Sequence, residues 1–425
     1  MCVDVALRLL KTEAASVSNS NIVRQRCYYT LDAFVKLMAL MIKYSDGGNA
    51  EKKIMLLKKV LHIITSVLHV DHEVRRAEFN AMPYHRILIT LFIELTTPDG
   101  SNLEPIAWSI IEAFGQNALF MLQPRRCPSF AYAWLDFVGH RAVIGALLGG
   151  NGFAENVDPM KTSAMYTQLL ICHLKFLAPF LRNIQLPKSI AVLYKGTLRV
   201  LLVILHDFPE LLCEYHYVII DTIPPNCVQL RNLVLSAYPR NMRLPDPFAL
   251  NFKISETPGS KYNSTVMNAM VLYVGMKAIE SLHERRQRIS IHTIAHTAFM
   301  DIFQNLAVQL CTEGRYLLFN AIANQLRYPN AHTHYFSCVF LFLFLNSDHD
   351  AIQEQITRIL FERLVALRPH PWGLLITFIE LIKNPVYNFW KYEFTRCAPE
   401  IERLFQNVAN TCVTARPAES EASKA

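Results

Sequence analysis

Apolar residues recur every three or four positions through most of this chain, and this period constrains its fold more than any other feature. The clearest stretch is 351–371, AIQEQITRILFERLVALRPHP, whose isoleucines and leucines fall on one stripe of a helix. The charged residues that fall off that stripe are Glu354, Arg358, Glu362 and Arg368. Alternating runs typical of strands are rare, and no Asn-Gly or Asp-Gly pair joins two of them. The pattern predicts an all-α fold.

Prolines punctuate these helices, because proline disfavours the α conformation in the residue before it and suits the first turn of a helix. Pro371, Pro385 and Pro399 are spaced 14 residues apart. This spacing predicts three short helices, at 372–382, 386–397 and 400–412, each folding back on the one before. About seventeen such helices with short turns favour an irregular HEAT-like helical array in two stacked halves.

A proline-rich segment without a sustained helical period divides the chain. We expect an N-terminal helical array at residues 1–239, a shortened linker at 240–261 and a C-terminal helical array at 262–413. The polar tail at 414–425 is expected to be disordered.

The composition supports a large buried core, with 52% hydrophobic and 18% charged residues. No apolar stretch has the length and purity of a membrane span, and the N-terminus does not resemble a signal peptide. Ten cysteines without a CxxC motif favour reduced thiols and a cytosolic chain. The net charge of +7 is mild, and its basic pairs are dispersed, which leaves RNA contact open as an alternative to solvated helix faces.

Motifs that carry chemistry are weak. His332, His334 and Cys338 are of the residue types that bind zinc, but His332 falls off the helical face that the other two share. The chain has no phosphate-binding glycine loop and no GxSxG motif. A cysteine nucleophile with a distant histidine stays open. We therefore expect no enzyme, no metal and no cofactor.

Surfaces for partners remain. Grooves between stacked helices accept helices or extended peptides, and tight docking depends on a few aromatic or arginine residues. Trp372 and Phe389 have core packing as their alternative role. The predicted partner-facing residues at helix junctions are Arg243, Arg327, Tyr328, His332, Tyr335, Trp372, Phe389 and Trp390.

Long strings of this sequence resemble a known family. MDIFQNLAV, TEGRYLLFNAIANQLRYPNAHTHYFSC, RPHPWGLLITFIELIKNP and CAPEIERLFQ are similar to the C-terminal superfamily-homology (Not-type) domain of the scaffold subunit one of the CCR-NOT mRNA deadenylase complex. DHEVRRAEFNAMPYHRI and YKGTLRVLLVILHDFPELLCEYHY resemble the earlier half of that domain. The resemblance covers nearly the whole chain.

The resemblance implies a helical scaffold without an active site. It implies docking of the Not-two and Not-three type subunits and of linear motifs from Nanos-type translational repressors, in support of mRNA deadenylation and decay. It also implies a cytoplasmic location that includes mRNA-processing bodies, with the nucleus as a second one. Membrane and small-molecule partners are not expected. A direct RNA-binding array is the alternative function.

Two departures from the family pattern stand out. The family has a further stretch of chain between LPDPFALNFKISE and TPGSKYN, which is why we expect a shortened linker. The segment NGFAENVDPMK also fits the pattern poorly and is interpreted as a variable loop.

Overall fold

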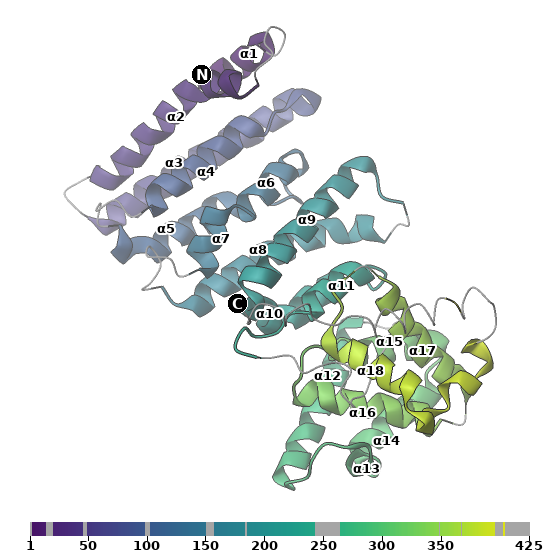
Figure 1. The fold of residues 1–425 in the computed structure, drawn as a ribbon. Coiled ribbons are helices and arrows are strands. Elements are labelled where there is room, and N and C mark those ends of the chain that lie inside the picture. Colours follow the sequence, from purple (N-terminus) through teal and green to yellow (C-terminus); the bar gives the residue numbers. More distant parts are fainter. Residues whose placement is uncertain are drawn as a thin grey trace, which may run out of the picture. The chain divides into compact units, whose positions relative to one another are not determined.

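The computed structural model describes residues 2–13, 20–45, 49–97, 103–149, 157–182, 185–242, 264–347, 349–366, 368–395 and 403. These residues form eighteen α-helices and no strand (Figure 1). They belong to two compact units, Met1–Val200 and Leu201–Ala425, called the first and second unit below. The predicted all-α class is confirmed.

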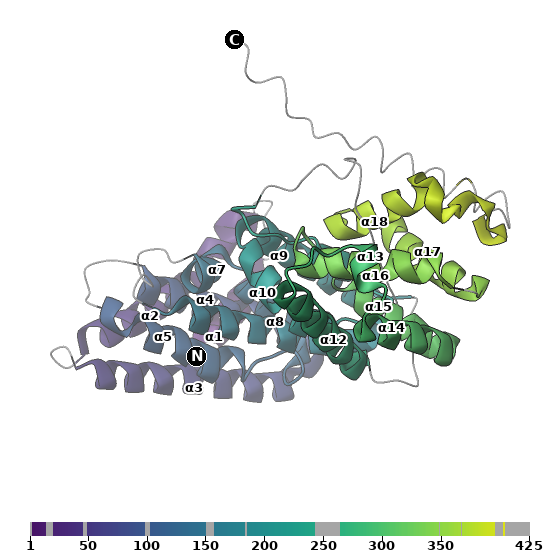
Figure 2. The same cartoon turned by 90° about the horizontal axis from the view of Figure 1, so that it is seen from below.

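The helices of the first unit pack chiefly on helices close to them in the chain. α1 packs on α2, α3 packs on α5, and α7 packs on α8, while α2 also contacts α4. In Figure 2, α3 lies along the lower edge of this unit. The helices are α1 (Cys2–Glu13), α2 (Ser20–Tyr44), α3 (Ala50–Arg75), α4 (Met82–Thr96), α5 (Ala107–Phe114), α6 (Ala131–Val138), α7 (Arg141–Leu148), α8 (Pro159–Leu181) and α9 (Lys188–Asp207), whose last turns belong to the second unit.

One cluster in the interior of the first unit combines an aromatic ring with a buried imidazole. The Trp134 indole N–H donates to the Leu119 carbonyl at 2.8 Å, and its ring stacks on His173 with 6.0 Å between centroids. The Thr197 hydroxyl donates to the Leu193 carbonyl, so its remaining capacity is to accept from His173 Nε2 at 2.7 Å. Burial lowers the pKa of His173 to about 4, which keeps the imidazole neutral.

The second unit is built around α16. This helix contacts α12, α13, α14, α17 and α18, and nearly all of its side chains from Tyr335 to Phe344 are buried. Such a helix has no polar stripe, because every face meets a neighbour. The helices are α10 (Pro209–Thr222), α11 (Val228–Leu235), α12 (Ser264–Glu284), α13 (Ile291–Ile294), α14 (Ala298–Gln309), α15 (Thr312–Ala323), α16 (Ala331–Leu345), α17 (Asp350–Val365) and α18 (Trp372–Lys383).

A buried polar network joins α10 and α11 to the later helices of the second unit. Arg231 donates to the Ile223 carbonyl and to Asn324 Oδ1, both at 3.0 Å. Arg363 also donates to Asn324 Oδ1, at 3.1 Å, and Asn232 donates to the Arg363 carbonyl at 2.6 Å. These bonds explain why α10 and α11 belong to the second unit and not, as the sequence led us to expect, to an array ending at residue 239.

Two further expectations about boundaries have different outcomes. Residues 243–261 of the predicted linker, the predicted helix at 400–412 apart from residue 403, and the tail lie outside the described residues. The predicted helix at 386–397 is wrong: three 3₁₀ turns, Pro385–Tyr387, Phe389–Lys391 and Glu393–Thr395, replace it. Tyr387 and Phe389 are both buried, and residues two apart on an α-helix cannot face one core, so Asn388 breaks the run with a φ of 47°.

Two helices, α8 and α9, are long and apolar enough to cross a membrane by length and composition alone. Half of the apolar window of α8 is buried inside the protein, and about a fifth of that of α9. The core helices of globular proteins pass the same test, so this finding is weak, and the absence of a membrane-spanning segment stays a prediction.

Candidate functional site

Three of the predicted residues gather in the turn between α15 and α16, called the α15–α16 junction (residues 325–333). Arg327 places its guanidinium 5.0 Å from the centre of the Tyr328 ring, in a cation–π contact. His332 lies in the first turn of α16. Tyr328 and His332 are half-buried, and Ala331 beside them is exposed.

The junction has this shape because its backbone groups are satisfied locally. Asn330 caps α16 by accepting the Thr333 N–H at 2.7 Å. The Thr333 hydroxyl donates to the Gln325 carbonyl at 3.0 Å and accepts the Arg327 N–H at 3.1 Å. The Gly373 N–H, at the start of α18, donates to the Arg327 carbonyl at 2.7 Å.

Gly373 is the residue that permits this last contact. A Cβ on Gly373 would lie 2.6 Å from Thr333 Cγ2 and 2.9 Å from the carbonyl carbon of Leu326. The backbone of α18 therefore approaches the junction more closely than any side chain allows.

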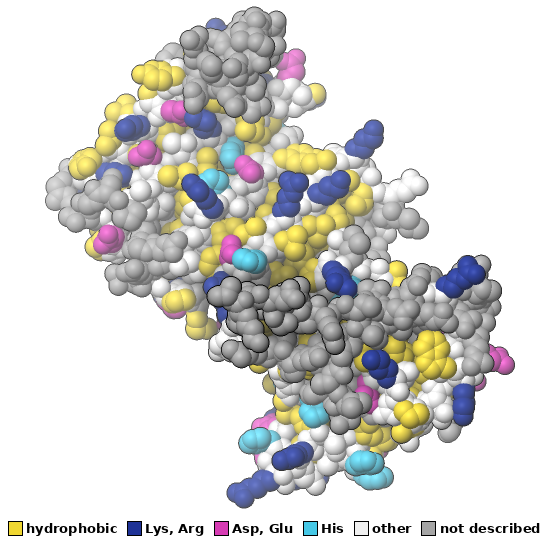
Figure 3. Space-filling view, in the orientation of Figure 1, with side chains coloured by type: hydrophobic (Ala, Val, Ile, Leu, Met, Phe, Trp, Pro, Cys, Tyr) yellow, Lys and Arg dark blue, Asp and Glu magenta, His cyan; other side chains and the backbone are white. Residues whose placement is uncertain are grey.

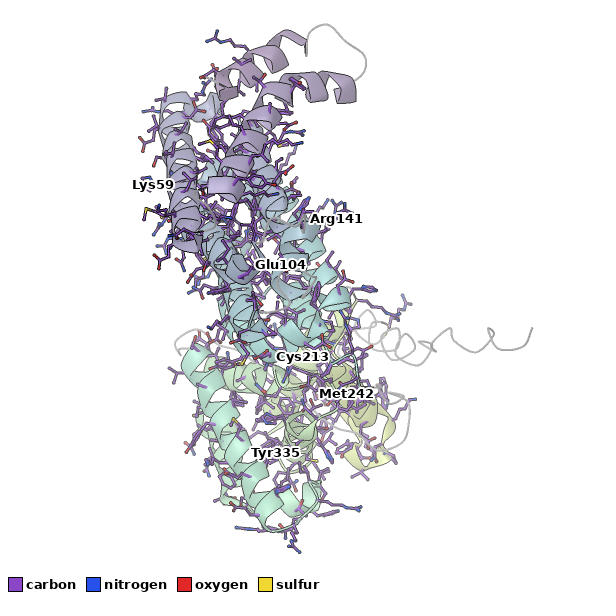
Figure 4. All side chains as sticks on the ribbon, turned by 90° about the vertical axis from the view of Figure 1, so that its left-hand side faces the viewer. Lys59, Glu104, Arg141, Cys213, Met242 and Tyr335 are labelled. Atoms are coloured by element: carbon purple, nitrogen blue, oxygen red, sulfur yellow. The ribbon has the colours of Figure 1, made fainter. Side chains whose placement is uncertain are left out.

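Arg327 is a buried cation for which the described residues supply no carboxylate partner. It is 7% exposed, and its Nη1 donates to the Cys213 carbonyl of α10 at 3.0 Å. Among the described residues it has no ion pair, and its Nε has no hydrogen-bond acceptor. Burial lowers the pKa of Arg327, because removal from water penalises the charged form. Figure 4 marks Cys213 on α10 and Tyr335 further into the second unit.

Two histidines border this cation. The Cys213 carbonyl also accepts the Nδ1–H of His216 at 3.0 Å, which leaves His216 Nε2 as a buried acceptor for which the described residues supply no donor. Burial, and then the charge of Arg327, lowers the pKa of His216 to about 3. The same two causes lower the pKa of His332. Both imidazoles are therefore neutral near pH 7, and the cluster carries the single positive charge of Arg327.

The remaining predicted residues do not form this site. Tyr335, Trp372 and Phe389 are core side chains, 0%, 6% and 2% exposed, which corrects the expectation that they face partners. Phe389 packs against Phe344, Phe378 and Trp390, because the 3₁₀ turns direct it inward. Trp390 is half-buried and donates its N–H to the Ile382 carbonyl at 3.0 Å. Arg243 lies outside the described residues.

The possible zinc ligands do not converge. The described residues contain no group of three histidine, cysteine or acidic side chains placed to hold a metal ion. Cys338 is buried within α16, while His332 lies at the N-terminus of that helix beside Arg327.

The basic pairs also differ from one another. Lys53 is buried, and Arg75 pairs with Asp4 at 2.6 Å and with Asp71 at 2.5 Å. Lys58 and Lys59 are exposed on α3, and Lys59 projects outward from the first unit in Figure 4. Paired or buried cations attract a polyanion less than free ones do.

An exposed apolar stripe runs along α2 in the first unit, where Figure 3 shows hydrophobic side chains at the upper left. Phe34, Leu37, Met41 and Tyr44 are spaced by three, four and three residues, as in the seam of a helix pair. Their exposed fractions range from 40% to 70%. Contiguous apolar surface of this kind is typical of protein-binding faces.

Sequence reasoning missed the contribution of α10 to the junction. Cys213 acts through its backbone carbonyl and lies 114 positions from Arg327, so no local pattern marks it. The sequence offered only CEYHY, with a cysteine and a histidine three positions apart, within a stretch quoted for the family resemblance.

Comparisons with known proteins agree with this fold. A family model described as "CCR4-Not complex component, Not1" matches residues 92–261 and 256–409. The chain is 68% identical over 474 aligned positions to the CCR4-NOT transcription complex subunit let-711 of Caenorhabditis elegans, a match that covers 99% of this chain and 18% of that protein. It is 32% identical over 450 positions to the general negative regulator of transcription subunit 1 of Schizosaccharomyces pombe, covering 93% and 21%.

The chain therefore spans about a fifth of the length of these relatives. The nematode alignment is longer than this chain, so that relative carries residues without a counterpart here.

Two solved structures share the fold. The NOT1 superfamily homology domain from Chaetomium thermophilum superposes with a TM-score of 0.82 at 26% identity, covering 96% of this chain and 87% of that one. A Not1 C-terminal domain in complex with Not4 superposes with a TM-score of 0.73 at 23% identity, covering 96% and 91%. On the family match and the nematode identity, this chain belongs to the Not1 family of CCR4-Not complex components.

Proposed function

We propose that this chain is a non-catalytic scaffold domain of a CCR4-NOT deadenylase complex, where it docks the Not-two and Not-three type subunits. The single observation that carries the proposal is the 68% identity to a CCR4-NOT subunit over 99% of this chain. At that identity, surface positions as well as core positions are shared. Catalysis would then belong to other subunits, and the domain would support mRNA deadenylation and decay by holding them in place.

The α2 stripe supports a docking role. Among the described residues, no helix of the first unit covers its apolar side chains, and their three-four spacing fits an amphipathic helix of a partner. The Not1 C-terminal domain of known structure was solved in complex with Not4, so a domain of this fold binds a polypeptide subunit. We also propose that the chain binds linear motifs of Nanos-type repressors. We further propose a cytoplasmic location.

Direct RNA binding is the weaker alternative. The basic pairs lie on different helices, one of their lysines is buried and Arg75 is neutralised by two aspartates. An extended RNA site needs a continuous run of free cations. We retain RNA contact as an outcome of the binding experiment below.

The proposal is tested by reconstitution. The purified chain is mixed with the Not-two and Not-three type subunits of its own organism, and complex formation is measured by size-exclusion chromatography with light scattering. A stoichiometric complex is expected. The absence of a complex, with the chain folded by circular dichroism, would contradict the proposal. A parallel titration with a fluorescent oligonucleotide over a salt series tests RNA contact.

A further inference from the structure

The cluster at the α15–α16 junction holds a positive charge that no described group neutralises. Buried arginines are normally paired, because desolvation of an unpaired charge costs more than the protein regains. The Arg327 side chain is 7% exposed, and its guanidinium contacts the Cys213 carbonyl and the Tyr328 ring. Among the described residues, the other buried arginines of the second unit, Arg231 and Arg363, each have two hydrogen-bond acceptors, whereas the Arg327 side chain has one.

A second feature makes the same place favourable for an anion. The first N–H groups of an α-helix have no intrahelical acceptor, and they form the positive end of the helix dipole. In α16 the Asn330 side chain satisfies the N–H of Thr333, which leaves those of Ala331 and His332. Thr333 accepts the Arg327 N–H at its hydroxyl and donates its own N–H to Asn330, so Arg327 is joined to the first turn of α16.

We propose that the α15–α16 junction is a receptor for a carboxylate side chain of a docking polypeptide, which Arg327 and the first N–H groups of α16 bind beside Tyr328. This proposal rests on the docking function proposed above and assigns one of its contacts. Tyr328 and His332 are half-buried in this turn, and Ala331 is exposed. An aspartate or glutamate of the docking polypeptide would supply the carboxylate that the described residues do not offer Arg327.

The charge of the cluster selects a carboxylate over a polyanion. With His216 and His332 neutral, the site carries one positive charge, which one carboxylate balances. Glu214 is exposed on α10, the helix that supplies Cys213, and it would repel a chain of several phosphates more strongly than a single carboxylate. A single acidic residue of a peptide fits the site better than a nucleic acid backbone does.

The decisive variant is Ala331→Glu. A glutamate in the first turn of a helix favours folding, yet its carboxylate competes for Arg327 and repels an incoming acid. We expect the affinity for the Not-two and Not-three type subunits to fall about tenfold, the loss of one charge-assisted contact. The matched control is Ala351→Glu, which adds the same side chain at an exposed position in the first turn of α17. The control should bind like the parent chain.

A second measurement tests the site without a partner. In the full chain labelled with ¹⁵N-arginine, the Arg327 Nε–H resonance is assigned by its loss in Arg327→Lys and followed during titration with acetate. One reference is acetamide at the same concentration as acetate, and the other is chloride at the same ionic strength. A saturable shift with acetate alone, absent in Ala331→Glu, supports the receptor. An equal response to chloride, or none, overturns it.

The outcomes separate the two proposals. If the parent chain binds its subunits and Ala331→Glu binds them equally well, the carboxylate receptor is refuted while the docking function stands. If the parent chain binds no subunit, the docking function fails, and the acetate titration alone decides the site. Displacement of acetate by an oligonucleotide but not by an acidic peptide would assign the site to RNA and contradict the proposal.

Discussion

The two units of this chain solve the burial of helices in different ways. In the first unit each helix packs mainly on neighbours in the chain, and α2 keeps an apolar stripe exposed. In the second unit α16 is surrounded, and two arginines lie inside a network of asparagines. A linear stack can leave apolar faces open for other polypeptides. A closed cluster must satisfy its internal polar groups itself.

The difference predicts that polar substitutions cost most in the second unit. Asn324→Leu removes the shared acceptor of Arg231 and Arg363 and leaves two buried guanidiniums short of partners. We expect the second unit to lose about 4 kcal/mol of unfolding free energy. Native-state hydrogen exchange of α15 and α17 measures the loss.

The counterpart in the first unit is Thr197→Val, which removes the acceptor of the neutral His173. A loss of about 2 kcal/mol is expected there, since the group left unpaired is not charged. Equal losses of unfolding free energy in Asn324→Leu and Thr197→Val would contradict the predicted difference between the two units.

The first unit should depend on pH through His173. Its folded pKa of about 4 lies below the ordinary 6.5, so the unfolded chain binds the proton more readily. The stabilisation is complete above pH 6.5 and is lost as the pH falls from 6.5 towards 4. The difference corresponds to about 3 kcal/mol.

The variant His173→Gln tests this dependence, because it can still donate to Thr197 and does not titrate. The free energy of unfolding in urea is measured between pH 4 and 7, with amide hydrogen exchange of α8 as the readout. It should depend less steeply on pH in this variant than in the parent chain. His85 and His140, whose pKa values burial also lowers, leave a residual slope. A variant with the parent's slope would show that His173 is not the titrating group.

Two glycines, one in each unit, test how closely the helices pack around them. Gly373→Ala should destabilise the second unit by about 2 kcal/mol, because the new methyl group meets the Leu326 backbone. Thermal unfolding monitored by calorimetry measures the change. In the first unit, a Cβ on Gly196 would lie 3.0 Å from the movable end of Leu135, and alanine favours a helix. Gly196→Ala is expected to be neutral or stabilising.

The smallest predicted effect concerns the open stripe. Met41→Glu, at a site 55% exposed, should weaken subunit binding about tenfold, or about 1.4 kcal/mol, and leave the fold intact. Met276→Glu on α12, at a site 50% exposed, is the control and should not alter binding. Isothermal titration calorimetry compares the two. A loss in both variants would indicate a general charge effect.

Local patterns predicted the helices well and the contacts between them poorly. The apolar period at 351–371 correctly indicated the helix α17, and the prolines at 371 and 385 correctly marked helix boundaries. Period and proline are properties of neighbouring residues, so one sequence reveals them. The run at 386–397 failed because aromatic burial overrode the helical spacing.

The candidate site was predicted only in part. The partner contacts of Arg327, Tyr328 and His332 stay predictions that rest on their place at a helix junction, whereas Tyr335, Trp372 and Phe389 proved to be core residues. Aromatic side chains suit both roles, and composition does not separate them. The bond between Arg231 and Asn324 joins positions 93 residues apart, a distance that no periodicity reports.

The junction forms only when the second unit has folded, because it includes the Cys213 carbonyl and the Gly373 amide. Segments far apart in the chain meet there, since one bonds the side chain of Arg327 and the other its backbone. A ligand recognised by that arginine would bind only molecules in which these distant segments of the second unit are already in contact. The free energy of binding would then add to the stability of the whole unit, and partly unfolded molecules would not bind the ligand.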